Sequence, residues 1–194
     1  MSIALDRFAP TDVPLLGVLA ERWSTRVFDA TEPLDEEAFV SALEAARWAP
    51  SANNTQPWRL IVARRGSAEH TALVGTLVGF NQTWAGDAAA LVVVVAETAN
   101  EDGTPMHFAL YDAGQAAAHF TVQAHAGGLA THQMGGFDRD AVRATFNLDS
   151  RFEPLTAIAV GAFGDIEDAS EAIRERENAP RTRRPIAESL LVNA

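Results

Sequence analysis

The stretch Ala49-Pro50-Ser51-Ala52-Asn53-Asn54-Thr55-Gln56-Pro57-Trp58 is a polar, amide-rich loop pinned by two prolines. It stands between a predicted helix and a predicted strand, so its polar groups would lie at fixed positions on a rigid scaffold. Amide side chains donate and accept hydrogen bonds, which suits a planar heterocycle with alternating C=O and N–H groups. The alternative is a turn closed by its own side-chain hydrogen bonds.

The helix before this loop is predicted over residues 35–48. Asp35, Glu36 and Glu37 crowd its first turn, where carboxylates favour the positive end of the helix dipole. Ala49-Pro50 ends it, because the residue before a proline avoids the helical conformation. Apolar periodicity predicts further helices over 14–23, 68–78, 108–126, 138–146 and 165–177, and strands over 60–63, 91–96 and 155–160.

Local signals refine these elements. Asp12 and Asp138 are expected to cap the helices that follow them, and Gly127-Gly128 to end the helix over 108–126. The many alanines of that helix predict close packing on more than one side. The strand over 91–96 should be central and buried, and the acidic segment 165–177 should be exposed. With no repeat and no linker, residues 1–194 are expected to form a single α+β or mixed α/β domain.

Composition excludes several kinds of chemistry. There is no cysteine, which rules out disulfides, thiolate-bound metals and a thiol nucleophile. All 15 basic residues are arginine, so Schiff-base chemistry and a Walker-type phosphate loop are excluded as well. The net charge of -11 disfavours nucleic-acid and anionic-membrane partners. The five scattered histidines predict no metal site, and no acid–base pair of side chains stands out.

No signal peptide, lipidation signal or spanning apolar run is found in the sequence. We therefore expect a cytoplasmic protein.

Three further segments carry a signal. Arg22-Trp23-Ser24-Thr25-Arg26-Val27-Phe28 could cradle a phosphate between guanidinium groups, or could simply be a basic helix terminus. The glycines of 127–138 allow close approach of a ligand at a helix start, or merely punctuate helices. Arg181-Thr182-Arg183-Arg184-Pro185 would otherwise be a solvated tail or a weak nucleic-acid arm.

Together and in this order, these segments resemble the FMN-dependent nitroreductase family, over about residues 15–191. The resemblance rests on Arg-x-Ser-x-Arg-x-Phe, Ala-Pro-Ser-x-x-Asn-x-Gln-Pro-Trp, the later Met-x-Gly-Phe-Asp and the C-terminal Arg-x-Arg-x-Pro. It implies a nitroreductase-like α+β fold, with a central, mostly antiparallel sheet flanked by helices, in an intertwined homodimer. It also implies FMN as cofactor and NAD(P)H as electron donor.

The resemblance assigns roles to individual residues. Arg22 would hold the FMN phosphate, joined by Arg181 and Arg183, and Arg26 would lie near the N1/O2 edge of the ring. Asn81 resembles the asparagine that bonds the pyrimidine edge. Other implied cofactor contacts are Trp23, Ser24, Gln133 and Met134, with Gly135 and Gly136 facing N5; Pro50, Ser51, Ala52 and Asn54 would reach FMN bound to the other subunit.

The sequence also departs from the family. Many relatives carry a basic residue shortly after the asparagine, whereas Gln82, Thr83 and Trp84 follow Asn81 here, which leaves Arg26 to stabilise the reduced cofactor. Only residues 97–107 stand where many relatives have a long helical lid, so a more open pocket is expected.

The expected activity is ping-pong transfer of electrons from NAD(P)H to a small acceptor, such as a nitroaromatic or a quinone. No side chain is expected to act as a catalytic acid or base. The alternatives are a dehalogenating or flavin-fragmenting enzyme on the same fold, an FMN-binding or storage protein without activity, and a structural domain without cofactor.

Overall fold

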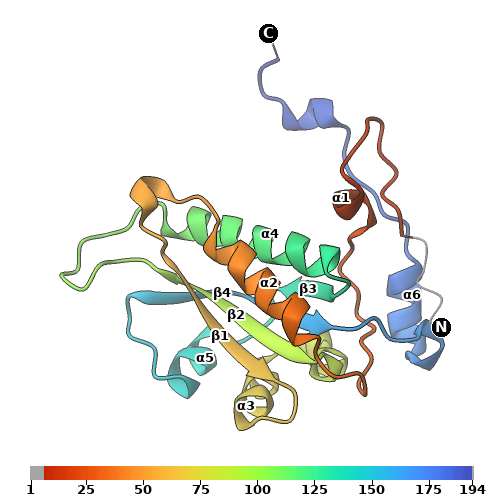
Figure 1. Ribbon diagram of the computed structural model, residues 1–194, viewed down its shortest axis with the longest axis horizontal. Helices are drawn as coiled ribbons and strands as arrows, with labels where there is room; N and C mark the ends of the chain where they lie inside the picture. Colours follow the sequence, from red (N-terminus) through yellow and green to blue (C-terminus); the bar gives the residue numbers. More distant parts are fainter. Residues whose placement is uncertain (1–6, 194) are drawn as a thin grey trace.

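A four-stranded antiparallel sheet forms the centre of the molecule in the computed structural model, which describes residues 7–193 (Figure 1). The strands are β1 (Trp58–Arg64), β2 (Ala90–Glu97), β3 (Ala130–Met134) and β4 (Phe152–Gly161), in the order β1-β2-β4-β3. β1 and β3 are therefore the two edges of the sheet. This confirms the predicted antiparallel sheet flanked by helices.

Helices cover both faces of the sheet (Figure 1). One face carries α2 (Glu36–Arg47) and α4 (Ala109–Ala126), and the other carries α3 (Ala68–Thr76) and α5 (Arg139–Thr145). Because side chains alternate along a strand, Val92 and Val94 pack under α2 and α4, whereas Val93 and Val95 pack towards α3 and α5. α1 (Gly17–Glu21) and α6 (Glu171–Asn178) lie at one end of the sheet.

Several local predictions are confirmed. Asp35 caps α2 by accepting a hydrogen bond from the Ala38 amide at 3.0 Å, and Asp138 caps α5 in the same way. Gly128 follows α4 with a φ of 87°, a left-handed conformation that glycine adopts without strain. Every residue of β2 is buried, as its uniformly apolar sequence predicts.

Three predictions were wrong. The helix expected over 14–23 is confined to α1, and no side chain caps it, so Asp12 has no such role. β3 was missed, because the glycines on either side of it were interpreted as helix punctuation. The segment 165–177 is not fully exposed: Ile173 and Glu177 lie one turn apart on the buried face of α6.

Large apolar side chains remain exposed on α4 and at the C-terminal end of α2. Leu110, Tyr111 and Trp48 are more than half exposed, and α4 also leaves Gly114 and Ala118 exposed. Within the chain α4 is therefore packed on one face only. After α6 the backbone leaves the body of the molecule, and its Leu191 is 99% exposed (Figure 1). Within residues 7–193, no helix has the length and apolar character needed to cross a membrane.

Candidate functional site

The segment from Arg22 to Phe28, which we call the flavin loop, runs in extended conformation beside the sheet. Ser24 forms a parallel bridge with Thr131 of β3, and Phe28 forms an antiparallel bridge with Phe163 just after β4. The Thr25 carbonyl is 2.8 Å from Nδ1 of His132. The loop is thus held against the β3 edge, with Ser24 exposed and Thr25 buried.

Arginines gather where α1 ends and the flavin loop begins. Burial, and then the charge of Arg183, lower the pKa of the Arg22 guanidinium. Burial also lowers the pKa of Arg181, and the positive charges of Arg22, Arg183 and Arg7 lower it further. The residues that the structure describes provide neither Arg22 nor Arg183 with an ion-pair partner. Like charges this close favour an anion between them, and a phosphate monoester fits such a donor set.

Arg181 differs from the other two predicted phosphate ligands. Its guanidinium donates to the carbonyls of Ala20 at 2.8 Å, of Arg22 at 2.9 Å and of Arg7. The side chain therefore fastens the segment after α6 to the end of α1. That leaves fewer N–H groups for a phosphate than Arg183 has, whose side chain donates only to the neighbouring Thr182 carbonyl.

Asn81 and Gly136, which the family resemblance places around one ring, are in direct contact. Asn81, within the 3₁₀ helix η2 (Gly79–Thr83), donates from Nδ2 to the Gly136 carbonyl at 3.1 Å. A Cβ on Gly136 would lie 2.7 Å from Asn81 Nδ2, so only glycine allows this approach. Gly135 has open space where a Cβ would stand. A flat ring would find open space beside Gly135, with backbone groups and the Asn81 amide around it.

The two predicted contacts on β3 differ in accessibility, because Gln133 is exposed and Met134 is buried. Gln133 donates from Nε2 to Thr121 Oγ1 at 2.9 Å, which holds its side chain against α4. Met134 is buried in the core, so a cofactor would meet its neighbours rather than its side chain. Burial lowers the pKa of His132, whose ring lies against the Trp84 indole at 4.6 Å between centroids.

The loop Pro50–Asn54 is a separate structure. Ser51 Oγ accepts from the Gln56 amide at 3.0 Å, and Asn53 and Asn54 both have positive φ, near 50°. Asparagine tolerates this conformation better than most residues, which explains the amide-rich sequence. The Ala52 amide donates to Oδ2 of buried Asp112, in the first turn of α4, at 3.0 Å.

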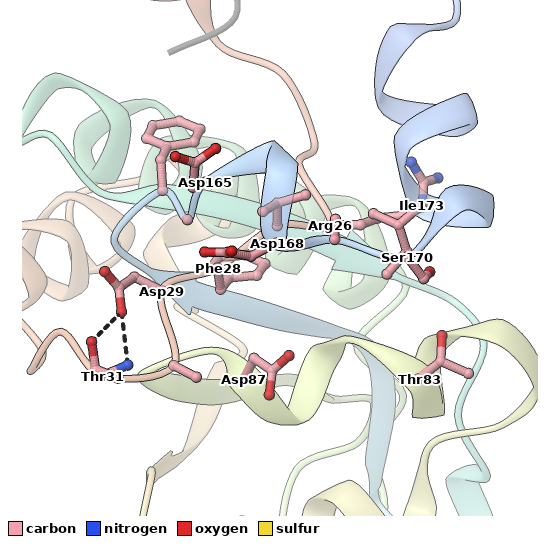
Figure 2. A pocket seen from close by; sticks show the side chains of 15 residues that line it. Arg26, Phe28, Asp29, Thr31, Thr83, Asp87, Asp165, Asp168, Ser170 and Ile173 are labelled. Atoms are coloured by element: carbon pink, nitrogen blue, oxygen red, sulfur yellow. Dashed lines mark hydrogen bonds between the residues drawn. The ribbon is translucent and has the colours of Figure 1, made fainter. Parts of the chain in front are cut away.

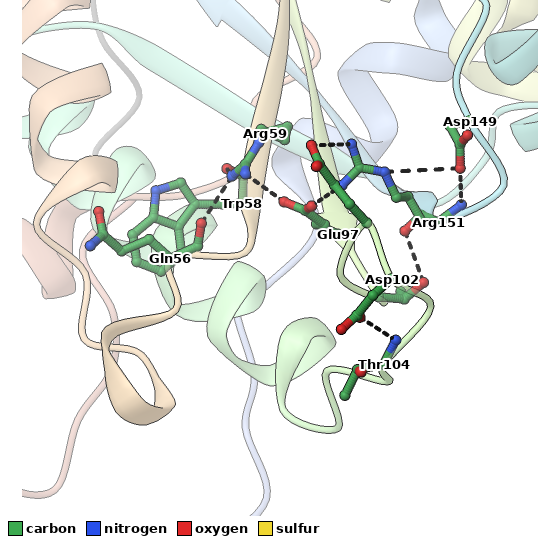
Figure 3. Close-up of polar contacts among 10 residues, drawn as sticks. Gln56, Trp58, Arg59, Glu97, Asp102, Thr104, Asp149 and Arg151 are labelled. Carbon is green, nitrogen blue, oxygen red and sulfur yellow. Dashed lines mark hydrogen bonds and ion pairs between the residues drawn. The ribbon is translucent and has the colours of Figure 1, made fainter.

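Buried Glu97 holds the base of this loop (Figure 3). Its carboxylate pairs with Arg59 and with Arg151, and its amide donates to the Pro57 carbonyl at 2.8 Å. Arg59 also donates to the Gln56 carbonyl at 3.0 Å. The network fixes the point at which the loop enters β1.

The two groups of predicted residues lie far apart in one chain. Pro50–Asn54 leads into β1, whereas the flavin loop and Gly136 border β3, and three strand spacings separate these edges by about 14 Å. Along α4, Asp112 contacts one group and His125 lies near Arg22 of the other, about 20 Å away at ~1.5 Å per residue. The structure brings Arg22, Arg181 and Arg183 together, and Asn81 with Gly136, but it does not bring Pro50–Asn54 to them.

A cavity of about 600 Å³ lies beyond the flavin loop (Figure 2). Of the predicted cofactor residues it contains Arg26 alone, and Asp29, Asp87, Asp165 and Asp168 surround it. These carboxylates repel a phosphate, so this cavity is not the cofactor site.

Sequence reasoning missed the buried acids that hold these loops, Glu177 and Asp112. Each lies in a helix one turn from a buried apolar residue: Glu177 from Ile173, and Asp112 from Ala109. Both acids therefore continue an apolar helix face, and this position is the signal in the sequence that could have identified them.

Known proteins match both the sequence and the fold. The Nitroreductase family profile matches residues 19–75 and 67–162. A protein of Bacillus subtilis named as an NAD(P)H nitroreductase, YdgI, is 26% identical, covering 77% of this chain and 88% of its own. A 15.4 kDa protein of Mycolicibacterium smegmatis is 38% identical, covering 64% of this chain and 88% of its own.

Solved structures agree. A crystal structure described as an oxidoreductase containing FMN superposes with a TM-score of 0.86 at 32% identity, covering 92% of this chain and 91% of that one. A nitroreductase of Desulfovibrio desulfuricans in complex with FMN gives a TM-score of 0.72 at 25% identity, covering 95% and 99%. The profile match spans well over half of the residues, and the chain therefore belongs to the nitroreductase family.

Proposed function

We propose that this protein is an FMN-dependent oxidoreductase that takes electrons from NAD(P)H and passes them to a small acceptor, such as a nitroaromatic or a quinone, by a ping-pong scheme. The observation that carries the proposal is that the arginine cluster of Arg22 and Arg183 and the Asn81–Gly136 contact both border β3. One chain thus offers groups for a phosphate and for a ring edge along the same edge of the sheet. The FMN and NAD(P)H named for its relatives support it.

Different side chains would bind different parts of FMN. Arg22 and Arg183 would bind the phosphate, and Asn81 would bond the pyrimidine edge of the ring. When bound, FMN supplies the hydride acceptor and donor for the two half-reactions. Arg26, partly buried, would face the negative charge that the cofactor gains on reduction, an attraction of a few kcal/mol (~4 at an effective dielectric of 20).

We also propose that the working unit is a homodimer of single-domain subunits. A two-fold axis across the exposed face of α4 would bring the Pro50–Asn54 loop of one subunit to the arginine cluster of the other. Gly114 and Ala118 allow close approach of two such helices, and exposed Tyr111 and Leu110 would be covered. Light scattering should give twice the mass of 20.8 kDa, and a monomer that binds FMN normally would contradict the shared site.

The proposed activity is tested by the absorbance spectrum of the purified protein before and after anaerobic addition of NADH or NADPH. Flavin bands that bleach support the proposal and identify the donor, after which acceptors are screened. Bands that persist with both donors would indicate a flavin-binding protein without this activity. A protein that takes up no flavin from added FMN would overturn the proposal.

A further inference from the structure

Three carboxylates are buried in the described part of the chain, and each of them holds one particular loop or strand end. Glu97 holds the start of β1, and Asp112 holds the Pro50–Asn54 loop. The third, Glu177, is 2% exposed and lies on α6, just before the arginines that follow this helix. The family resemblance assigns no role to it.

All four hydrogen-bond donors of Glu177 come from the flavin loop. Its Oε2 accepts from the Trp23 indole and from the Thr25 hydroxyl, both at 3.2 Å. Its Oε1 accepts from the Arg26 amide at 3.0 Å and from the Arg26 guanidinium at 3.4 Å. One carboxylate thus accepts four hydrogen bonds from three residues of the loop, which lie about 150 residues away in sequence.

The charge of Glu177 matters as well as its geometry. A buried carboxylate is costly unless it is paired, and Arg26 is the cation within ion-pair distance of it. Arg26 therefore shares its positive charge between Glu177 and anything bound at the exposed side of the loop. A neutral residue at 177 would leave that charge to the bound cofactor alone.

We propose that Glu177 is a positioning residue for the cofactor: it fixes the flavin loop between Trp23 and Arg26 and sets how much of the Arg26 charge reaches the flavin. This inference rests on the proposed FMN site. Through Glu177 and Arg26, α6 would therefore affect the reduction potential of bound FMN.

The test is Glu177→Gln, with Glu175→Gln as the matched control on the exposed side of the same helix. In flavin-free protein, hydrogen exchange at the amides of residues 23–27 should become faster in Glu177→Gln and stay unchanged in the control. In the FMN-loaded protein, the dissociation constant should rise on the order of tenfold. The reduction potential of the flavin should become more positive, because Arg26 is no longer neutralised.

The reduction potential of the bound flavin distinguishes a positioning role of Glu177 from a loss of protein stability. In an Arg26→Gln background, Glu177→Gln should no longer shift the potential, whereas a purely structural defect would persist. Trp23→Phe serves if Glu177→Gln does not fold: it removes one donor to Glu177, keeps an aromatic ring where the indole stacks on Phe163, and should speed exchange at the amides of residues 23–27.

The outcomes distinguish this inference from the proposed function. Unchanged exchange in both variants, or a potential shift that is independent of Arg26, would overturn the role of Glu177 even if the wild type binds and reduces FMN. Faster exchange in a protein that takes up no FMN would instead remove the proposed function, and with it any role of Glu177 towards a cofactor.

Discussion

The flavin loop and the Pro50–Asn54 loop carry the same kind of predicted function but are held in opposite ways. The flavin loop depends on distant partners: Glu177, Arg181 and His132 all bind it from more than a hundred residues away. The Pro50–Asn54 loop is closed mainly by its own neighbours, with two hydrogen bonds to α4: the Ala52 amide donates to Asp112, and Gln115 donates to the Pro50 carbonyl. A loop of the first kind is rigid only when the whole chain has folded around it, whereas one of the second kind is determined by its local sequence.

The largest effect is expected at the arginine cluster. Arg183→Ala should weaken FMN binding about 10- to 100-fold, since a charged hydrogen bond to phosphate contributes ~1.5–3 kcal/mol. Arg184→Ala is the matched control, because Arg184 is the adjacent exposed arginine. Fluorescence titration of FMN measures both. An Arg183→Ala protein that purifies fully loaded would exclude Arg183 as a phosphate ligand.

The next effect concerns Asp112, the acid that anchors the Pro50–Asn54 loop to α4. Asp112→Ala leaves the Ala52 amide without its acceptor and should lower the free energy of unfolding by about 1–3 kcal/mol. Asp140→Ala, at an acid whose side chain is 98% exposed on α5, is the control and should change it little. Urea unfolding measures both. Equal stabilities would show that the loop is held by its own turn alone.

The two loops also differ in how much of their structure could be predicted from the sequence. The Pro50–Asn54 loop, the capped helices and buried β2 follow from short-range signals, and the structure confirms them. The burial of Glu177 could be inferred from its place on the apolar face of α6, but its partners could not, because they are specified by the packing of α6 and not by any spacing along the chain. β3 was missed for the same reason: its pairing with β4 decides its conformation, while its flanking glycines favour turns.

A smaller effect is expected from pH. Burial lowers the pKa of His132 below 6.5, so the unfolded chain takes up a proton there at a higher pH than the folded protein does. Acidification below about pH 6.5 should therefore lower the melting temperature, and His132→Gln should reduce that dependence. The same substitution at exposed His107 controls for the chemical change. An identical pH profile in wild type and His132→Gln would contradict this role.

The smallest effect is expected within the local turn. Asn53 has a φ of 52°, so Asn53→Ala should destabilise the protein by about 1 kcal/mol, while Asn53→Gly should be close to neutral. Thermal unfolding compares the two variants. Equal losses for alanine and glycine would mean that the asparagine side chain, and not its backbone conformation, stabilises the turn.

The contacts of α6 also have a consequence for the order of events in the cell. Arg22 and Arg183 bracket one proposed phosphate site, although most of the chain is synthesised between them. During translation, the flavin loop emerges early and has neither Glu177 nor Arg181 to hold it. Contacts of such long sequence separation form late. Cofactor capture would therefore be among the last steps of maturation, after the sheet has already assembled.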